Sequence, residues 1–296
     1  MNDPAEPARH DQNVHDPRQL CCVAIEAARA CGAYLLDSWQ APRGEYEEKS
    51  PGDLVSEVDR KSQEMARSIL LARSPGSRFF GEEDARTRST KARGQDVLWI
   101  VDPLDGTANF VHRFPVFSVS IAAAAGSELL AGVVFNPVSG ELFEAAAGEG
   151  ARLNGEPVSV TGESDLSRAL LATGWPFRKK DLLEAYLRVF QRVFWASQGI
   201  RRLGSAALDL CYLAAGRLEG FWEYGLGLWD IAAGALIVRE AGGRVSDFAG
   251  GEGWWDSGDI VATNGAVHEA LLAAAETPQG MRDLEPGSQL PASDSF

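Results

Sequence analysis

The amino-acid sequence predicts a layered fold that mixes α-helices and β-strands. Apolar residues recur at helical spacing near both ends, and short apolar runs typical of strands alternate with helical segments in the second half. The length of 296 residues suits one large domain or two modest ones. Elements of both kinds along the whole chain indicate α/β or α+β layers, although local pattern leaves the strand order open.

The first part of the chain predicts two helices. One covers 17–40, with Asp16 as its N-cap and Pro17 at its first position. The second runs from about 56 to 73 and ends before Pro75-Gly76. The polar stretch 43–51 between them is interpreted as a loop.

Strands and helices follow in a mixed order. The apolar runs predict strands at 78–81, 97–101, 118–124, 130–135, 141–146, 169–173, 200–203, 220–224 and 259–263. Asn154-Gly155 indicates a hairpin turn. Helices are predicted at 181–196, 206–215, 229–241 and 266–275. The polar ends, 1–16 and 277–296, are expected to be disordered tails around a single domain at 17–276.

Composition excludes several classes of protein. A net charge of -14, from 28 Lys+Arg and 42 Asp+Glu, makes direct binding to nucleic-acid phosphates a poor hypothesis. The four cysteines form no CxxC pair, which is typical of reduced thiols. The first 16 residues lack the apolar core of a signal peptide, and no run of 18 apolar residues predicts a membrane span. We therefore expect a cytoplasmic enzyme or binding protein that does not enter a membrane.

The most informative stretch is Trp99–Thr107, W-I-V-D-P-L-D-G-T. An apolar strand brings Asp102 to its end, and the Pro-Leu turn brings Asp105 back beside it, with the Leu104 carbonyl between them. Two carboxylates and a carbonyl suit a hard cation such as Mg2+, and a short helix after Gly106 would offer N–H groups to a phosphate. The alternative is a turn that only satisfies its own backbone.

Two further acidic positions each have both a structural and a functional interpretation. Glu82, in Gly-Glu-Glu-Asp after a strand, belongs either to the same cation site or to a solvated loop. Asp230, after Gly-Leu-Trp, is either a ligand or a residue that caps an apolar helix. Lys49 and Asp59 lie around the start of the second helix, and nothing local requires either to face a site.

Taken in order, six blocks resemble the inositol monophosphatase family. They are K-x3-D-L-V-x3-D, G-E-E, W-I-V-D-P-L-D-G-T-x-N-F-x-H-x-F-P, G-S-A-A-L-D, W-E-x5-W-D and E-A-G-G. The resemblance covers roughly residues 18–275. It implies an αβαβα sandwich of the type shared with fructose-1,6-bisphosphatase, a homodimer, and a lithium-sensitive phosphomonoesterase that uses two or three Mg2+ ions.

The resemblance also implies roles for individual residues. Metal ligands would be Glu82, Asp102, Asp105, Asp230 and the Leu104 carbonyl, and Asp105 and Leu104 would also lie against the substrate. Gly106 and Thr107 would contact the phosphate, and Lys49 would lie near its entrance. Thr107 and Asp59, with Glu82, would activate water, while Gly204, Ser205, Ala206 and Glu223 would contact the alcohol.

The expected reaction is hydrolysis of myo-inositol 1-phosphate by activated water. The chain has only 4 His and no GxSxG nucleophile motif, which suits Mg2+ and direct attack by water. Glu223 suits a polyol but would equally pair with the ammonium group of histidinol phosphate, which remains an alternative substrate. Another alternative is a protein that binds the transcription machinery through RNA polymerase. A calcium-buffering protein is disfavoured because the EF-hand loop is absent.

Overall fold

Helices and strands alternate along the described chain much as the apolar pattern predicts. The structure, a computed structural model, describes residues 16–41, 46–50, 53–84, 96–177 and 180–275. The helices of this part are α1 (Pro17–Gln40), α2 (Glu57–Arg73), α3 (Thr107–Val111), α4 (Leu183–Ala196), α5 (Ala206–Ala214), α6 (Leu228–Glu240), α7 (Trp254–Ser257) and α8 (His268–Ala275).

The strands form a hairpin and two larger sheets. The hairpin pairs β1 (Tyr46–Ser50) with β2 (Asp53–Ser56). A seven-stranded sheet has the order β3 (Arg78–Gly81), β4 (Val97–Asp105), β5 (Ser118–Ala125), β6 (Glu128–Asn136), β7 (Glu141–Ala146), β8 (Ala151–Leu153), β9 (Glu156–Val158). A five-stranded sheet has the order β11 (Gly199–Arg201), β10 (Leu170–Thr173), β12 (Gly220–Glu223), β14 (Ile260–Thr263), β13 (Arg244–Ser246).

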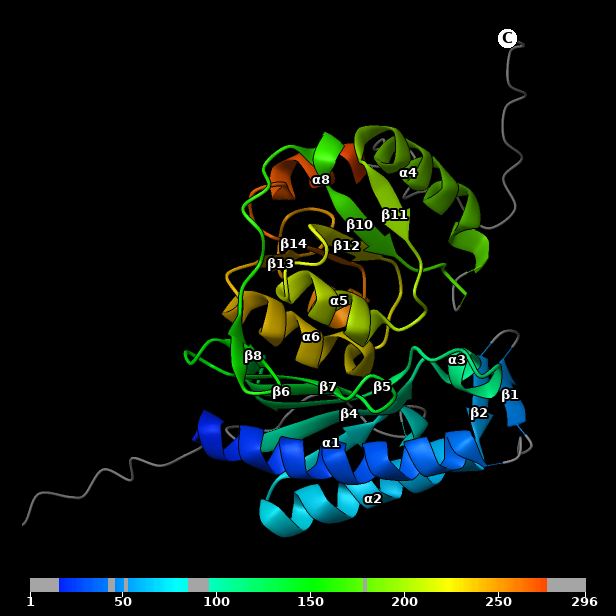
Figure 1. Ribbon diagram of the computed structural model, residues 1–296, viewed down its shortest axis with the longest axis vertical. Helices are drawn as coiled ribbons and strands as arrows, with labels where there is room; N and C mark the ends of the chain where they lie inside the picture. The colour runs from blue at the N-terminus through cyan, green and yellow to red at the C-terminus, as the bar shows by residue number, and fades with distance from the viewer. Residues whose placement is uncertain (1–15, 42–45, 51–52, 85–95, 178–179, 276–296) are drawn as a thin grey trace, which may run out of the picture.

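Five layers stack on one another (Figure 1). Helices α1 and α2 cover the outer face of the seven-stranded sheet, α5 and α6 lie between the two sheets, and α4 and α8 cover the other face of the five-stranded sheet. Three clusters of buried apolar side chains fill the spaces between these layers. The αβαβα sandwich that the sequence resemblance implied is therefore confirmed.

Helix α1 begins where its capping residue predicts. Asp16 accepts a hydrogen bond from the Arg18 backbone N–H at 3.0 Å, and Pro17 follows it. By length and composition alone α1 would be able to cross a membrane, but half of its most apolar window is buried in the fold. Its apolar face packs on β5 and β6, so the layered core accounts for its composition.

Two local predictions have contrasting outcomes. The interpretation of 43–51 as a loop is wrong, because Tyr46–Ser50 is a strand that pairs antiparallel with β2. Its polar sequence has no apolar alternation, so only the partner strand defines it. The turn at Asn154-Gly155 is confirmed: both residues have positive φ, 52° and 85°, and they join β8 to β9.

The fold brings β4 and the first turn of α6 face to face. All nine residues of β4 are buried in the seven-stranded sheet. Helix α6 packs closely on this sheet because Gly132 on β6 has no side chain: a Cβ there would lie 2.8 Å from the Ala233 carbonyl oxygen. This close packing sets the distance between the carboxylates of β4 and Asp230.

Candidate metal and phosphate site

The end of β4 departs from regular strand geometry where the acidic residues lie. The pairing of β4 with β5 shifts between Asp102 and Asp105, which indicates a bulge over Pro103 and Leu104. Residues three apart on a regular strand point to opposite faces. The bulge therefore allows both carboxylates to face the same side, and Asp102 Oδ1 accepts the Leu104 N–H at 2.9 Å.

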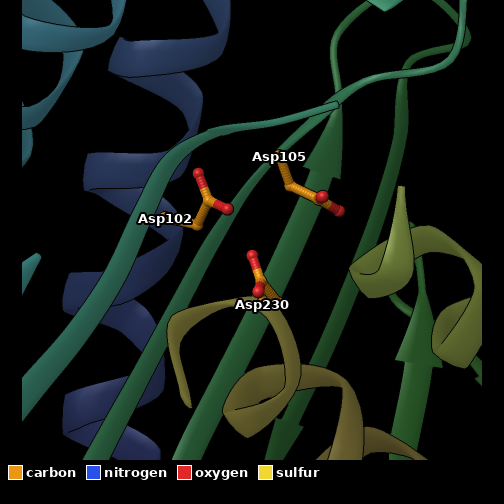
Figure 2. A group of neighbouring side chains, drawn as sticks. All are labelled: Asp102, Asp105 and Asp230. Atoms are coloured by element: carbon orange, nitrogen blue, oxygen red, sulfur yellow. The ribbon is translucent and has the colours of Figure 1, made fainter. Parts of the chain in front are cut away.

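Three buried aspartates converge at this point (Figure 2). Asp102 and Asp105 come from β4 and Asp230 from the first turn of α6, and each offers an oxygen within 4.8 Å of the others. Asp230 also caps its helix, because its Oδ2 accepts the Gly227 N–H at 2.6 Å. The capping interpretation of Asp230 is therefore confirmed, and the same side chain also faces Asp102 and Asp105.

Glu82 lies near these aspartates but outside their compact group. It follows β3 in a single helical turn, Glu82–Asp84, and it lines the same cavity. Its charge acts on Asp102, since it is among the causes that raise the pKa of that carboxyl.

The electrostatics of the group favour a bound cation. Burial raises the pKa of Asp102 well above its usual value, and the charges of Glu82, Asp105 and Asp230 raise it further. Buried like charges repel unless an opposite charge is present. Three carboxylates and a neighbouring carbonyl form the oxygen donor set that Mg2+ prefers, so the residues fit such an ion.

A second polar pair lies beside the aspartates. The Thr107 hydroxyl, at the start of α3, is 3.0 Å from Asp59 Oδ1 and 3.1 Å from the Leu104 carbonyl oxygen. Gly106 precedes it with φ of 90°, a left-handed conformation that favours glycine. Asp59 is fully buried on α2, so its carboxylate reaches the cavity through Thr107.

The start of α5 holds Asp105 from the other side. Ser205, the N-cap, donates its hydroxyl hydrogen to Asp105 Oδ2 at 2.5 Å, and the Ala207 N–H donates to the same oxygen at 2.9 Å. The serine side chain is buried and directed at Asp105. Gly204 and Ala206 flank it and line the cavity.

One cavity of about 660 Å3 unites most of the residues that the sequence singled out. They are Glu82, Asp102, Leu104, Asp105, Gly106, Thr107, Gly204, Ser205, Ala206, Glu223 and Asp230. Glu223 comes from the end of β12, and its carboxyl group lies against Gly174, where a Cβ would be 2.1 Å away. Lys49 lies on β1, and its side chain is outside the part of the chain that the structure describes.

Sequence reasoning did not include several residues that line this cavity. Trp175 and Phe177 lie two and four residues after the end of β10. The guanidinium of Arg202 is 5.4 Å from the Phe177 ring centre. Asp209 is buried in α5, and its Oδ1 has no hydrogen-bond partner in the described part of the chain. Burial and the charge of Glu223 raise the pKa of Asp209 well above its usual value. The position of Trp175 and Phe177 just past a strand end was the available signal.

Comparisons with known proteins agree with this geometry. The model of the inositol monophosphatase family matches residues 16–279. A Pseudomonas aeruginosa protein named Nus factor SuhB is 44% identical over 257 residues, 86% of this chain and 94% of that protein. A Mesorhizobium japonicum protein named inositol-1-monophosphatase is 41% identical over 264 residues, 89% of this chain and 98% of that protein. The crystal structure of extragenic suppressor protein suhB from Bartonella henselae has a TM-score of 0.80 and 39% identity, and the match covers 87% of this chain and 98% of that chain.

Proposed function

Because the chain belongs to the inositol monophosphatase family, we propose that it hydrolyses myo-inositol 1-phosphate to inositol and phosphate with Mg2+ as cofactor. The observation that carries the proposal is the convergence of Asp102, Asp105 and Asp230 beside the Thr107–Asp59 pair. The cavity that contains this convergence also contains Glu223. It therefore offers a place for a cation, a phosphate and a polyol together.

The acidic residues would hold Mg2+. Asp102, Asp105 and Asp230 would provide carboxylate oxygens, with the Leu104 carbonyl beside them and Glu82 at the edge of the group. When bound, Mg2+ would neutralise charge on the ester, make a water molecule more acidic and stabilise the leaving oxygen.

The neighbouring residues would place the phosphate and move the proton. Gly106 and Thr107 line the cavity at the start of α3, where backbone N–H groups would receive phosphate oxygens. The Thr107 hydroxyl would orient water, and Asp59 behind it would take up the proton. Lys49 would add positive charge near the phosphate entrance, as the family resemblance implies.

The opposite end of the cavity would receive the alcohol. The Glu223 carboxylate would accept hydrogen bonds from polyol hydroxyl groups. Gly204 and Ala206 would contact the same part of the substrate. Ser205 would affect the position of the substrate indirectly, because its hydroxyl donates a hydrogen bond to Asp105.

Phosphate release from a panel of esters tests this proposal. The panel would contain inositol 1-phosphate, histidinol phosphate, fructose 1,6-bisphosphate and 3′-phosphoadenosine 5′-phosphate, each with Mg2+, with EDTA and with added Li+. We expect Mg2+-dependent, Li+-inhibited release that is fastest with inositol 1-phosphate. Release from histidinol phosphate alone would keep the chemistry and change the substrate. No release from any ester would overturn the proposal.

A second role is favoured by the name of a relative. The P. aeruginosa protein that is 44% identical is named a Nus factor, which supports a proposal that this chain also binds the transcription machinery. A pull-down with RNA polymerase would test it. The Asp102→Asn variant should still bind the polymerase if the two roles are separate, because the change is buried.

We also propose that the enzyme is a cytoplasmic homodimer. Helix α4 exposes a group of large apolar side chains, Leu183, Leu187, Phe194 and Trp195, and Trp195 is 79% exposed. Exposed apolar patches of this kind often mark subunit interfaces. Sedimentation equilibrium should give twice the mass of one chain.

A further inference from the structure

Helix α2 turns three polar side chains toward the site from its buried face. Asp59, Ser62 and Gln63 are 0%, 0% and 6% exposed, and their spacing puts them on one side of the helix. Buried polar groups are costly unless they are hydrogen-bonded. Each of the three bonds to a different segment of the site: Asp59 to Thr107, Ser62 to Pro103 and Gln63 to Glu83.

Ser62 supports the bulge of β4. Its hydroxyl donates to the Pro103 carbonyl oxygen at 2.9 Å. Pro103 lies between Asp102 and Leu104, where the pairing with β5 is interrupted. The serine therefore ties α2 to the backbone segment that carries the two aspartates.

Gln63 supports the turn that carries Glu82. Its Oε1 accepts the Glu83 backbone N–H at 3.0 Å. The missing side chain of Gly81 makes room for this contact, because a Cβ there would lie 2.2 Å from the same Oε1. The structure therefore explains the glycine of the Gly-Glu-Glu block: without a side chain, Gly81 leaves space for the carboxamide of Gln63.

We propose that Ser62 and Gln63 are positioning residues that together set the separation between Glu82 and the Asp102–Asp105 bulge. One rigid helix turn links both segments, so α2 determines how tightly the acidic group holds a divalent cation. Glu82 lies outside the compact group of aspartates, and its contribution therefore depends on where the backbone at 82–83 is held. This inference rests on the proposed function, in which these carboxylates bind Mg2+. Residues that orient metal ligands commonly change metal affinity by about 10- to 100-fold.

The test compares Gln63→Met, Gln63→Glu and Glu64→Met. Gln63→Met keeps the approximate volume but removes the acceptor, while Gln63→Glu keeps an oxygen there. Glu64→Met puts the same side chain at the neighbouring exposed position of α2. Binding of Mn2+ would be measured from the electron paramagnetic resonance signal of free Mn2+, below the melting transition of every variant.

We expect Gln63→Met to weaken Mn2+ binding by about tenfold or more. The Mn2+ affinity of Gln63→Glu and Glu64→Met should stay within roughly threefold of wild type, which is less than the change expected when a contact that orients a ligand is lost. At saturating Mg2+, kcat of Gln63→Met should return to within a few-fold of wild type, because the reacting groups are intact. A general loss of structure would lower kcat at every Mg2+ concentration.

If wild-type protein binds Mn2+, two results would overturn the inference. One is unchanged Mn2+ binding in Gln63→Met, and the other is equal weakening in Gln63→Met and Gln63→Glu. If Gln63→Met does not fold, Gly81→Ala is the second variant: it should displace the carboxamide and weaken Mn2+ binding in the same way. If wild-type protein binds no Mn2+, the proposed function and this inference are both overturned. If wild type binds Mn2+ and Gln63→Met and Gly81→Ala bind it equally well, only this inference is overturned.

Discussion

The Thr107 hydroxyl lies 3.0 Å from Oδ1 of Asp59, a residue 48 positions earlier in the chain. The bond joins the start of α3 to the buried face of α2. The hydroxyl has one hydrogen, and when it donates this to Asp59 its lone pairs are left to accept from water. In the proposed reaction, a proton from water would reach the Asp59 carboxylate through Thr107.

Asp59→Asn should reduce turnover without removing the cation. We expect kcat to fall by about 100- to 10,000-fold, the usual contribution of a general base. Mn2+ binding should stay close to wild type, because Asp59 is outside the group of three aspartates. Steady-state kinetics and Mn2+ titration check the two parts. Activity within threefold of wild type would exclude Asp59 from proton transfer.

Asp102→Asn should remove catalysis while leaving the fold intact. Without a cation the Asp102 carboxyl is buried among like charges, so its loss relieves repulsion, and the variant in EDTA should melt no lower than wild type. Turnover should fall by at least about 100-fold. Thermal denaturation and phosphate release measure these effects. Near-normal turnover would show that the cation site is wrongly assigned.

Gly174→Ala should reproduce the effect of Glu223→Ala. A Cβ at 174 would overlap the Glu223 carboxyl group, so the alanine must displace it. Both variants should raise KM for a polyol phosphate by roughly 10- to 100-fold, as expected when hydrogen bonds to a charged group are lost. An ester without hydroxyl groups, such as phenyl phosphate, should be little affected.

Gly162→Ala is the matched control for that change, because nothing lies within 4 Å of the position where its Cβ would be. Equal effects of Glu223→Ala on both esters would remove Glu223 from the contacts to the alcohol.

His268 should make the free energy of unfolding depend on pH in the acidic range. The ring is buried between the hydroxyl groups of Ser246 and Thr263, each 2.9 Å away. Burial, and then the charge of Arg244, lower the pKa of His268 from 6.5 to about 4. Between these values the unfolded chain binds the proton more readily. The stabilisation that neutral His268 contributes is therefore fully present above about pH 6.5 and is lost as the pH falls toward 4.

The contribution of His268 is of the order of 3 kcal/mol at most, at about 1.4 kcal/mol per pKa unit. Urea denaturation of wild type and His268→Gln from pH 4 to 7 measures it. The variant should show a smaller loss of stability over this window. Parallel curves for the two proteins would show that another group is responsible.

Much of the fold follows from local sequence. The helix at Pro17–Gln40 has its cap, its proline and its apolar face within its own sequence, and the strand at 97–101 is a continuous apolar run. Two other strands have no such local signal. Tyr46–Ser50 lacks alternation and Arg244–Ser246 spans only three residues, so their pairing with neighbours defines them. The short strand Gly199–Arg201 overlaps the one predicted at 200–203, with its bounds shifted toward the N-terminus.

The sequence by itself determined the family, the layered architecture and the acidic residues of the candidate site, because these are recorded in short motifs and in apolar periodicity. Only the tertiary structure decided how those residues are held. The contact of Ser205 with Asp105 spans 100 positions, and that of Gln63 with the Glu83 N–H depends on the packing of α2 against β3. The physical reason is that motifs report residue identity, whereas hydrogen bonds and the approach of like charges depend on distances that only packed layers establish.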